Sequence, residues 1–428
     1  MLKAGRFDGQ ARFWPSRAGG VGLAVACAAV LAAAAPDVGG ARPAQPRRPA
    51  PAAVAAKLTA YPTPYYIIHT DLDKDSIREA VVRMTCMARE YQKRTAGFGR
   101  QVRTRLPFYL FSRAEDYYAA GGMPGSAGVY MGNKLMARAD KKMGENVWRV
   151  IQHEGFHQYV HQVLSHRVPV WVNEGMAEYF GEGIWTGDSF VTGAVPPWRL
   201  KQLKGAIKGG RMLPFLEMLE MSYDQWQTNF ASRNYLQAWA MVHFLAHADD
   251  GKYQEALNGF LNDIARGGVS WKTSFLRRFG RDVDGFQKRF SEWWTSQPDN
   301  PTADLYAEAA VRTLMSFFGR AFGQGQRFAD IDEFFKAARE DSLKEDPKLF
   351  LPKDLLAQTM KRAPGYGRWE LLNPKGIPRI QLTTPAGTVL TGSFNVRPGA
   401  SVTVNVETKK GAPRAEKVTG GGEAPGGG

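Results

Sequence analysis

The stretch HEGFHQYVHQVLSHRVPVWVNEGMAEYF, residues 153–180, contains four of the chain's seven histidines. His153 and His157 are four residues apart, so a helix would place both imidazoles on one face, where they can ligate one metal ion. Glu154 would be rotated by about 100° around that helix, and its carboxylate could deprotonate a water molecule instead of ligating the metal. Chance predicts an HExxH match only about 0.005 times in a chain of this composition, so we interpret this one as a metal site.

Two further histidines of this stretch do not suit the third ligand position. A catalytic zinc ion usually has three protein ligands and one open position. His161 would lie about 12 Å along the helix axis from His153, too far for one ion with bonds of about 2 Å. His166 lacks the glycine turn that precedes a third histidine in zinc enzymes of that type. The third ligand is therefore expected beyond this helix.

An acidic residue on a second helix is the better candidate for the third ligand. Pro169 interrupts the first helix, and Asn173 is positioned to cap a short second helix that ends near residue 180. The first turn of that helix offers Glu174 as the third ligand. Glu178 lies four residues later on the same face, so it could orient a ligand histidine by accepting its second N–H.

The flanking segments predict an α+β fold. The runs at 65–71, 106–111 and 128–138 are typical of strands, and 76–94 has apolar residues at helical spacing. After residue 200 the pattern is helical, most clearly at 234–248, 253–265 and 283–296. Two more helices are expected between about 303 and 362, and residues 376–407 alternate as strands do.

Composition divides the chain into six expected segments. They are a signal peptide (1–35), a Pro/Ala-rich linker (36–58), a main domain (59–300), a helical extension (301–365), a small β segment (366–407) and a disordered tail (408–428). The main domain is expected to contain an α/β lobe (59–144), a pair of metal-site helices (145–182) and a helical lobe (183–300).

The amino terminus has the pattern of an export signal. Four basic residues precede the apolar run of residues 21–35, and a stretch rich in Ala, Pro and Gly follows it. An uncleaved anchor is the alternative, although the run is shorter than the roughly 18 to 20 residues of a spanning helix. The apolar run continues past Cys27, which argues against a lipidated cysteine there. We expect an exported protein, periplasmic, envelope-bound or extracellular, with no membrane span in the mature chain. Cys86 is expected to be buried and inert.

The charge does not indicate nucleic-acid binding. The formal net charge is +15, but residues 1–58 contribute +6, so the remainder carries only +9. Runs of Lys and Arg interleaved with aromatic residues, which mark a nucleic-acid groove, are absent from the sequence. We therefore expect no nucleic-acid partner.

The HExxH motif and the segment around Glu174 resemble those of a known group of enzymes. HEGFH and, after 16 intervening residues, Glu174 within NEGMAEYF resemble the gluzincins, zinc metallopeptidases of the peptidase MA clan. WVNEGMAEY is similar to the corresponding stretch of aminopeptidase N-like enzymes. The strand-rich start, the GVY strand and the helix NYLQAWAMVHFL further resemble exported bacterial peptidase-MA-like proteins, many of unknown function. The resemblance covers about residues 60–300, and its zinc motifs are more specific than its flanks.

The resemblance implies a zincin-like fold with a mixed-sheet N-terminal lobe, an HExxH active-site helix and a mainly helical C-terminal lobe. It implies that Zn²⁺ is bound by His153, His157 and Glu174, with Glu154 as general base and Glu178 as the acid that orients a ligand. Such enzymes also stabilise the oxyanion with a Tyr or His. Tyr235 is the candidate and His243 the runner-up, whereas the pair of His243 and His247 without an adjacent acid is interpreted as structural.

These features lead to one leading hypothesis and two rivals. The first is an exported zinc endopeptidase acting on peptide or protein substrates, which could pair with the strand at 128–131. The GxMEN motif of aminopeptidase N-like enzymes is absent, since the chain has GVYMGN at 128–133, so their exopeptidase specificity is not carried over. The rivals are a cell-envelope binding protein with a structural zinc and a self-processing protein that cleaves its own linker or tail.

Overall fold

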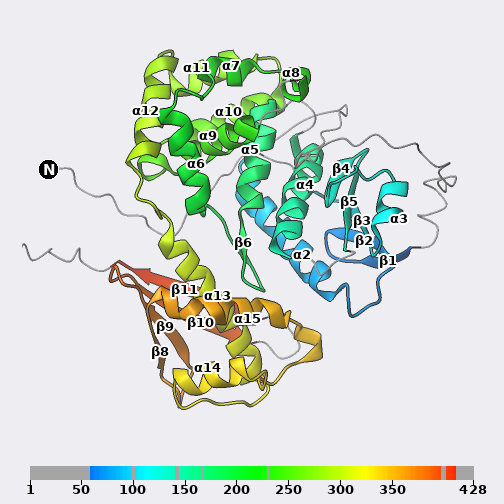
Figure 1. Cartoon of the computed structure of the whole chain (residues 1–428), viewed down its shortest axis with the longest axis vertical. Helices are drawn as coiled ribbons and strands as arrows, with labels where there is room; N and C mark the ends of the chain where they lie inside the picture. Colours follow the sequence, from blue (N-terminus) through cyan, green and yellow to red (C-terminus); the bar gives the residue numbers. More distant parts are fainter. Residues whose placement is uncertain are drawn as a thin grey trace, which may run out of the picture. The chain divides into compact units, whose positions relative to one another are not determined.

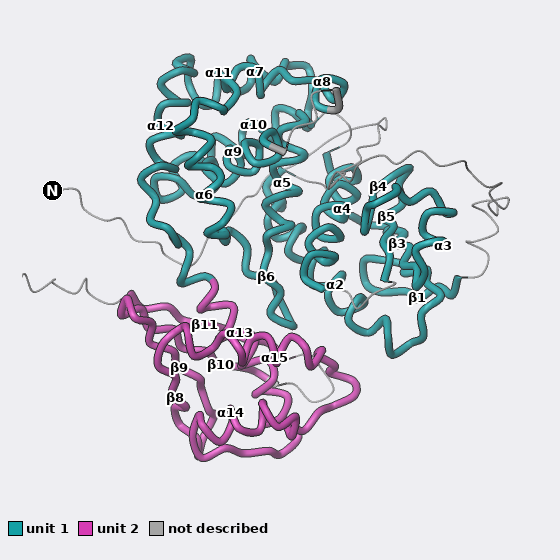
Figure 2. Tube along the Cα trace, viewed as in Figure 1, with its two compact units in different colours: residues 1–305 teal, residues 306–428 magenta. Residues whose placement is uncertain are grey.

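The computed structural model describes residues 58–98, 102–139, 144–164, 168–228, 232–396 and 402–410. The chain forms two compact units, residues 1–305 and 306–428 (Figure 2). Helices and strands occur in both, which confirms the α+β class. The expected signal peptide, the linker up to residue 57 and the tail from residue 411 lie outside the described residues. Within the described part of the chain, no helix combines the length and the apolar character needed to cross a membrane.

Unit 1 begins with a five-stranded mixed sheet, ordered β1-β2-β3-β5-β4 (Figure 1). The strands are β1 (Thr59–Pro62), β2 (Tyr66–Thr70), β3 (Leu106–Phe111), β4 (Gly128–Met131) and β5 (Lys134–Arg138). β3 runs parallel to β2 and β5, whereas β4 pairs antiparallel with β5 and forms an edge of the sheet. Gly132 and Asn133 join β4 to β5 with φ values of 54° and 68°, and such positive values suit a tight hairpin. β1 was not anticipated from the sequence.

The helix that carries HExxH, α4 (Glu145–Leu164), packs against β4, β5 and α5 (Val170–Gly181). It lies between the sheet and α5 in Figure 1. Its apolar residues include the fully buried Ile151 and Phe156, and its polar residues Gln152, His153, Glu154, His157 and Gln158 are buried too. A helix buried on this many sides can bury polar groups only when they are paired or hydrogen-bonded.

Gln152 ties the end of α5 to α4. Its Nε2 donates to the carbonyl oxygens of Phe180 and Gly183, both at 3.1 Å, and its Oε1 accepts from the Arg83 guanidinium at 2.9 Å. Arg83 belongs to α2 (Arg78–Thr95) and is buried beside Trp148 and Trp185. The carbonyls at a helix end have no partner within the helix, so this amide satisfies groups that would otherwise be buried without one.

One expectation about α5 was wrong. The helix begins at Val170, and Pro169, not Asn173, is its N-cap residue. The carbonyl oxygen of Pro169 accepts from the backbone N–H groups of Val172 and Asn173, both at 3.0 Å. Proline is compatible with this position, because its ring-fixed φ of −54° and its missing N–H cost nothing before the first turn. Asn173 lies within the helix and is free to contact the site.

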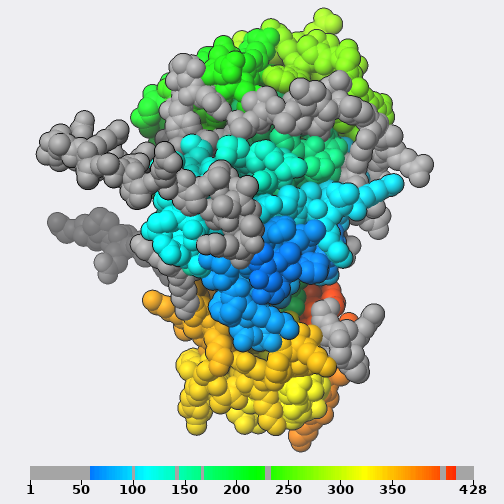
Figure 3. Space-filling view, turned by 90° about the vertical axis from the view of Figure 1, so that its right-hand side faces the viewer, coloured from blue at the N-terminus to red at the C-terminus, as the bar shows by residue number. Residues whose placement is uncertain are grey.

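Most of the remaining elements of unit 1 are helical. They are α3 (Ala114–Ala119), the β6–β7 hairpin (Ile184–Trp185 and Phe190–Val191), α6 (Pro197–Lys208), α7 (Phe215–Glu220), α8 (Tyr223–Thr228), α9 (Ser232–Gly251), α10 (Gln254–Arg266), α11 (Trp271–Phe279) and α12 (Val283–Ser296). Residues of the sheet lobe, coloured blue to cyan, form part of the surface of unit 1 in Figure 3. The expected strand-rich start and helical continuation are both present.

Gly175, next to Glu174, lies where α5 and α9 approach each other most closely. A Cβ atom there would be 2.4 Å from the Ala238 carbonyl oxygen and 2.7 Å from Val242 Cγ2. We expect Gly175→Ala to lower the free energy of unfolding by about 3 kcal/mol, since a backbone carbonyl cannot move aside as a side chain can. Urea unfolding measures the change.

The matched control is Gly205→Ala, on the exposed face of α6. The nearest atom to its added Cβ is Arg211 Nη2 at 3.9 Å. This variant should gain about 0.5 to 1 kcal/mol, as alanine usually does over glycine within a helix. Equal stability of the two variants would contradict the close approach of α5 and α9.

Unit 2 is built from helices packed on one face of a four-stranded antiparallel sheet, ordered β11-β10-β9-β8. The strands are β8 (Arg368–Leu372), β9 (Arg379–Thr383), β10 (Val389–Val396) and β11 (Val402–Lys409), and the main helices are α13 (Ala303–Gly323), α14 (Ile331–Arg339) and α15 (Lys353–Arg362). Alternate strand residues such as Ile380 and Leu382 are fully buried in the same core as Leu314 and Phe318. Three helices occur where two were expected, and the strands begin at Arg368 and end at Lys409, beyond both limits of the expected alternation.

Candidate metal centre

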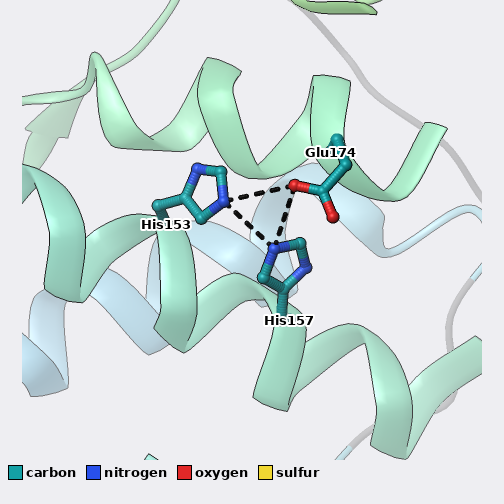
Figure 4. Close-up of side chains that lie close together, drawn as sticks. All are labelled: His153, His157 and Glu174. Atoms are coloured by element: carbon teal, nitrogen blue, oxygen red, sulfur yellow. Dashed lines mark hydrogen bonds and ion pairs between the residues drawn. The ribbon is translucent and has the colours of Figure 1, made fainter. Parts of the chain in front are cut away.

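Three buried side chains converge between α4 and α5 (Figure 4). The Nε2 atoms of His153 and His157 are 3.1 Å apart, and each lies 3.4 Å from Oε2 of Glu174. We call these three residues the His–His–Glu cluster. The four-residue spacing on α4 brings the imidazoles together, and the first half of α5 supplies the carboxylate.

The atoms of this cluster fit a metal ion. Nδ1 of each ring lies 3.1 Å from an acceptor oxygen, of Glu178 or Asn173, so a neutral imidazole carries its proton there and both Nε2 atoms face each other as acceptors without a donor. Oε1 of Glu174 is also buried without a hydrogen-bond partner. Such orphaned polar atoms are rare in protein interiors, and a cation among the three side chains would satisfy them. The cluster can therefore hold a metal ion.

The second nitrogen of each histidine is held by α5. Nδ1 of His153 lies 3.1 Å from Oε1 of Glu178, and Nδ1 of His157 lies 3.1 Å from Oδ1 of Asn173. These contacts direct both Nε2 atoms towards Glu174, because donation from Nδ1 sets the tautomer and the ring orientation. Glu178 lies where the sequence placed it, whereas the contact of Asn173 with His157 was missed, since an Asn before an apolar helical segment is also typical of a cap.

The carboxylates around the histidines favour a positive charge. Burial lowers the pKa of His153, but the carboxylates of Glu174 and Glu178 outweigh it and raise that pKa to about 10. Burial raises the pKa of Glu174, but the imidazoles of His157 and His153 outweigh burial and lower that pKa to about 2. Without metal, protons on the imidazoles balance these carboxylates, and a divalent cation would replace those protons.

Glu154 lies beside the cluster and is held by the edge strand β4. Its Oε2 accepts from the backbone N–H of Tyr130 at 2.8 Å, and its side chain is 1% exposed. Burial raises the pKa of Glu154, while the nearby imidazoles of His153 and His157 act in the opposite direction. The carboxylate is therefore placed beside the cluster, not within it, as the rotation of one residue along α4 predicts.

His161 of the motif stretch lies outside the cluster. Nδ1 of His161 is hydrogen-bonded to the Tyr130 hydroxyl at 2.6 Å, so this side chain ties the edge strand to α4. His166 lies outside the described residues. The contact between Tyr130 and His161 was not anticipated, because no local pattern links a strand residue to a helix 31 positions later.

The two oxyanion candidates are placed differently. The ring of Tyr235, on α9, lies 6.4 Å from the ring of His153 between centroids. His243, about two turns further along α9, donates from Nε2 to the Gly193 carbonyl oxygen at 3.0 Å, and burial lowers its pKa to about 4. His247 is hydrogen-bonded to the Tyr179 hydroxyl at 2.9 Å. Tyr235 thus lies beside the cluster, and His243 is engaged elsewhere.

Two arginines that the sequence analysis missed surround Glu178. Arg199 on α6 and Arg149 on α4 both contact the carboxylates of Glu178 and Glu182. We call these four residues the arginine–carboxylate cluster. Neither arginine has a distinctive spacing from HExxH, so only packing reveals them.

Cys86, expected to be buried, is 5% exposed.

A protein-family model matches part of the chain. Neither a curated protein nor a solved structure matches the chain. The matched segment runs from Trp148 in α4 to Arg266 at the end of α10, so it includes the whole His–His–Glu cluster. Over residues 148–266, the chain matches the model of a family described as "Protein of unknown function (DUF1570)".

Proposed function

We propose that this chain is an exported, zinc-dependent metallopeptidase of the gluzincin type, with a zincin-like fold in unit 1. The observation that carries the proposal is the buried His–His–Glu cluster with the carboxylate of Glu154 beside it. Two imidazoles and one carboxylate are the ligand set of many catalytic zinc sites, and they leave a position open. The export signal in the sequence and the resemblance to exported peptidase-MA-like proteins support the proposed location.

In this proposal His153, His157 and Glu174 hold Zn²⁺. When bound, the ion supplies Lewis acidity, which polarises a peptide carbonyl and makes water nucleophilic at neutral pH. Glu154 takes a proton from the attacking water at Oε1. The Tyr130 N–H holds Oε2, and this contact fixes the direction of the carboxylate. As the C–N bond breaks, the same carboxyl passes its proton to the leaving amine.

The edge of the sheet is the proposed binding site for an extended substrate. In the described part of the chain β4 is an edge strand, and its backbone at Tyr130 faces Glu154. An extended peptide that pairs with this edge would therefore pass beside the general base. Met131, at the end of β4, is 36% exposed and would contact such a peptide. Tyr235 is the candidate for stabilising the developing oxyanion, because its ring lies next to His153.

The test combines metal content with peptide cleavage. We expect elemental analysis of the purified mature protein to find about one zinc ion per chain, and mass spectrometry to find hydrolysed products in a mixed peptide library. Cleavage should stop with a chelator and return with added Zn²⁺. Zinc binding without cleavage of any peptide would favour the binding protein with a structural zinc, and a protein that binds no zinc would overturn the proposal.

A further inference from the structure

We propose that Arg199 is a positioning residue for the metal centre, acting on His153 through Glu178. The inference rests on the proposed function, because it concerns the same site. Nη2 of Arg199 lies 2.6 Å from Oε2 of Glu178, while Oε1 of that carboxylate lies 3.1 Å from Nδ1 of His153. One carboxylate thus connects a guanidinium on α6 to a metal-binding histidine on α4.

The guanidinium of Arg199 is held in place on three sides. Its side chain is 4% exposed, Nη1 lies 2.7 Å from Oε1 of Glu182, and the guanidinium carbon lies 4.5 Å from the centre of the Trp239 ring. A planar guanidinium with two carboxylates and an aromatic face has little freedom to rotate. Arg199 therefore presents a fixed donor to Glu178.

A fixed donor determines where the Glu178 carboxylate points. Each oxygen of Glu178 has its own partner, Arg199 or His153, so rotation of the carboxylate would break at least one short contact. Arg199 and Arg149 both contact Oε2 of Glu178, so their positive charges balance the charge of this carboxylate. The ionised and oriented carboxylate then sets which nitrogen of His153 carries the proton and leaves Nε2 for the metal.

Arg149 provides the comparison within the same cluster. Its side chain is 34% exposed, and its Nη2 lies 3.4 Å from Oε2 of Glu178, compared with 2.6 Å for Arg199. Arg149 makes its shorter contact, 2.9 Å, with Glu182 instead. If the arginines affected zinc binding only through their charge, removing either of them would have a similar effect. If they act by positioning Glu178, removing Arg199 should have the larger effect.

The experiment measures Zn²⁺ affinity by competition with a chromogenic chelator in the full-length mature protein. We expect Arg199→Met, which keeps the stem on Trp239, to weaken zinc binding by about tenfold, the lower end of the range for groups that orient a ligand. Arg149→Met should weaken it by less than about threefold. Equal effects of the two variants, or an unchanged affinity in Arg199→Met, would overturn the inference.

A double-mutant cycle tests whether Arg199 acts through Glu178. In the Glu178→Gln background, Arg199→Met should cause almost no further loss of zinc affinity, because the carboxylate that transmits its effect is gone. If the two losses multiply, Arg199 acts independently and the inference is wrong. If Arg199 had a general structural role, Arg199→Met would still weaken zinc binding in the Glu178→Gln background. The cycle therefore separates positioning through Glu178 from such a role.

A conservative variant covers the case in which Arg199→Met does not fold. Arg199→Lys retains the charge, but a single ammonium cannot reproduce the two-sided contact with Glu178 and Glu182. It should weaken zinc binding by a few-fold in the wild-type background and not at all with Glu178→Gln, and multiplying losses would again contradict the inference. Wild-type protein that binds no zinc would overturn the proposed function and this inference together, whereas failure of the cycle alone leaves the proposed function intact.

Discussion

Glu154→Gln is expected to keep the metal and to lower kcat for peptide hydrolysis by about 10²- to 10⁴-fold, the usual contribution of a general acid–base group. The amide has nearly the same shape, and its oxygen can still accept from the Tyr130 N–H, so the surroundings of the cluster should not change. It cannot take a proton from water, however. Turnover is measured on a peptide that the wild type has been shown to cleave, together with the zinc content of each preparation.

The control for this variant is Glu145→Gln in the first turn of the same helix. That side chain is 57% exposed and contacts Arg83 at 3.4 Å. It should hydrolyse the test peptide at the wild-type rate. If Glu154→Gln retained full activity, Glu154 could not be the general base. If the Glu154→Gln protein contained much less zinc than the wild type, Glu154 would have a role in metal binding.

Glu174→Ala is expected to weaken zinc binding by more than the 10- to 100-fold typical of groups outside the ligand set. It removes one of the three ligands and leaves His153 and His157 without the carboxylate that lies 3.4 Å from both Nε2 atoms. Elemental analysis after dialysis should therefore fall from about one zinc ion per chain to a small fraction.

Glu220→Ala is a suitable comparison, because it removes a half-exposed carboxylate at the end of α7 that contacts Lys272 and none of the three ligands. It should retain about one zinc ion per chain after the same dialysis. Retention of zinc by Glu174→Ala with unchanged affinity would remove Glu174 from the ligand set and require a different third ligand.

The elements with strong local patterns were predictable. The periodicities at 106–111 and 283–296 match β3 and α12 residue for residue, because alternation and helical spacing reflect which side of each segment is buried. Short elements such as β1, α3 and the β6–β7 hairpin were missed. Their few residues give too little periodicity to separate a strand or a turn of helix from a loop.

Sequence alone was enough to identify the ligand candidates, because their arrangement depends on helix geometry within one short stretch. The four-residue spacing of His153 and His157 places both rings on one face of any straight helix, whatever surrounds it. The partners of those side chains depend on the packing of segments far apart in the chain. The contact between Tyr130 and Glu154, the close approach of Gly175 to α9 and the bridge from Arg199 to Glu178 arise only when the strand and the helices pack together. Such contacts cannot be predicted from the spacing of residues along the sequence, since the intervening loops can vary in length while the distances in space stay the same.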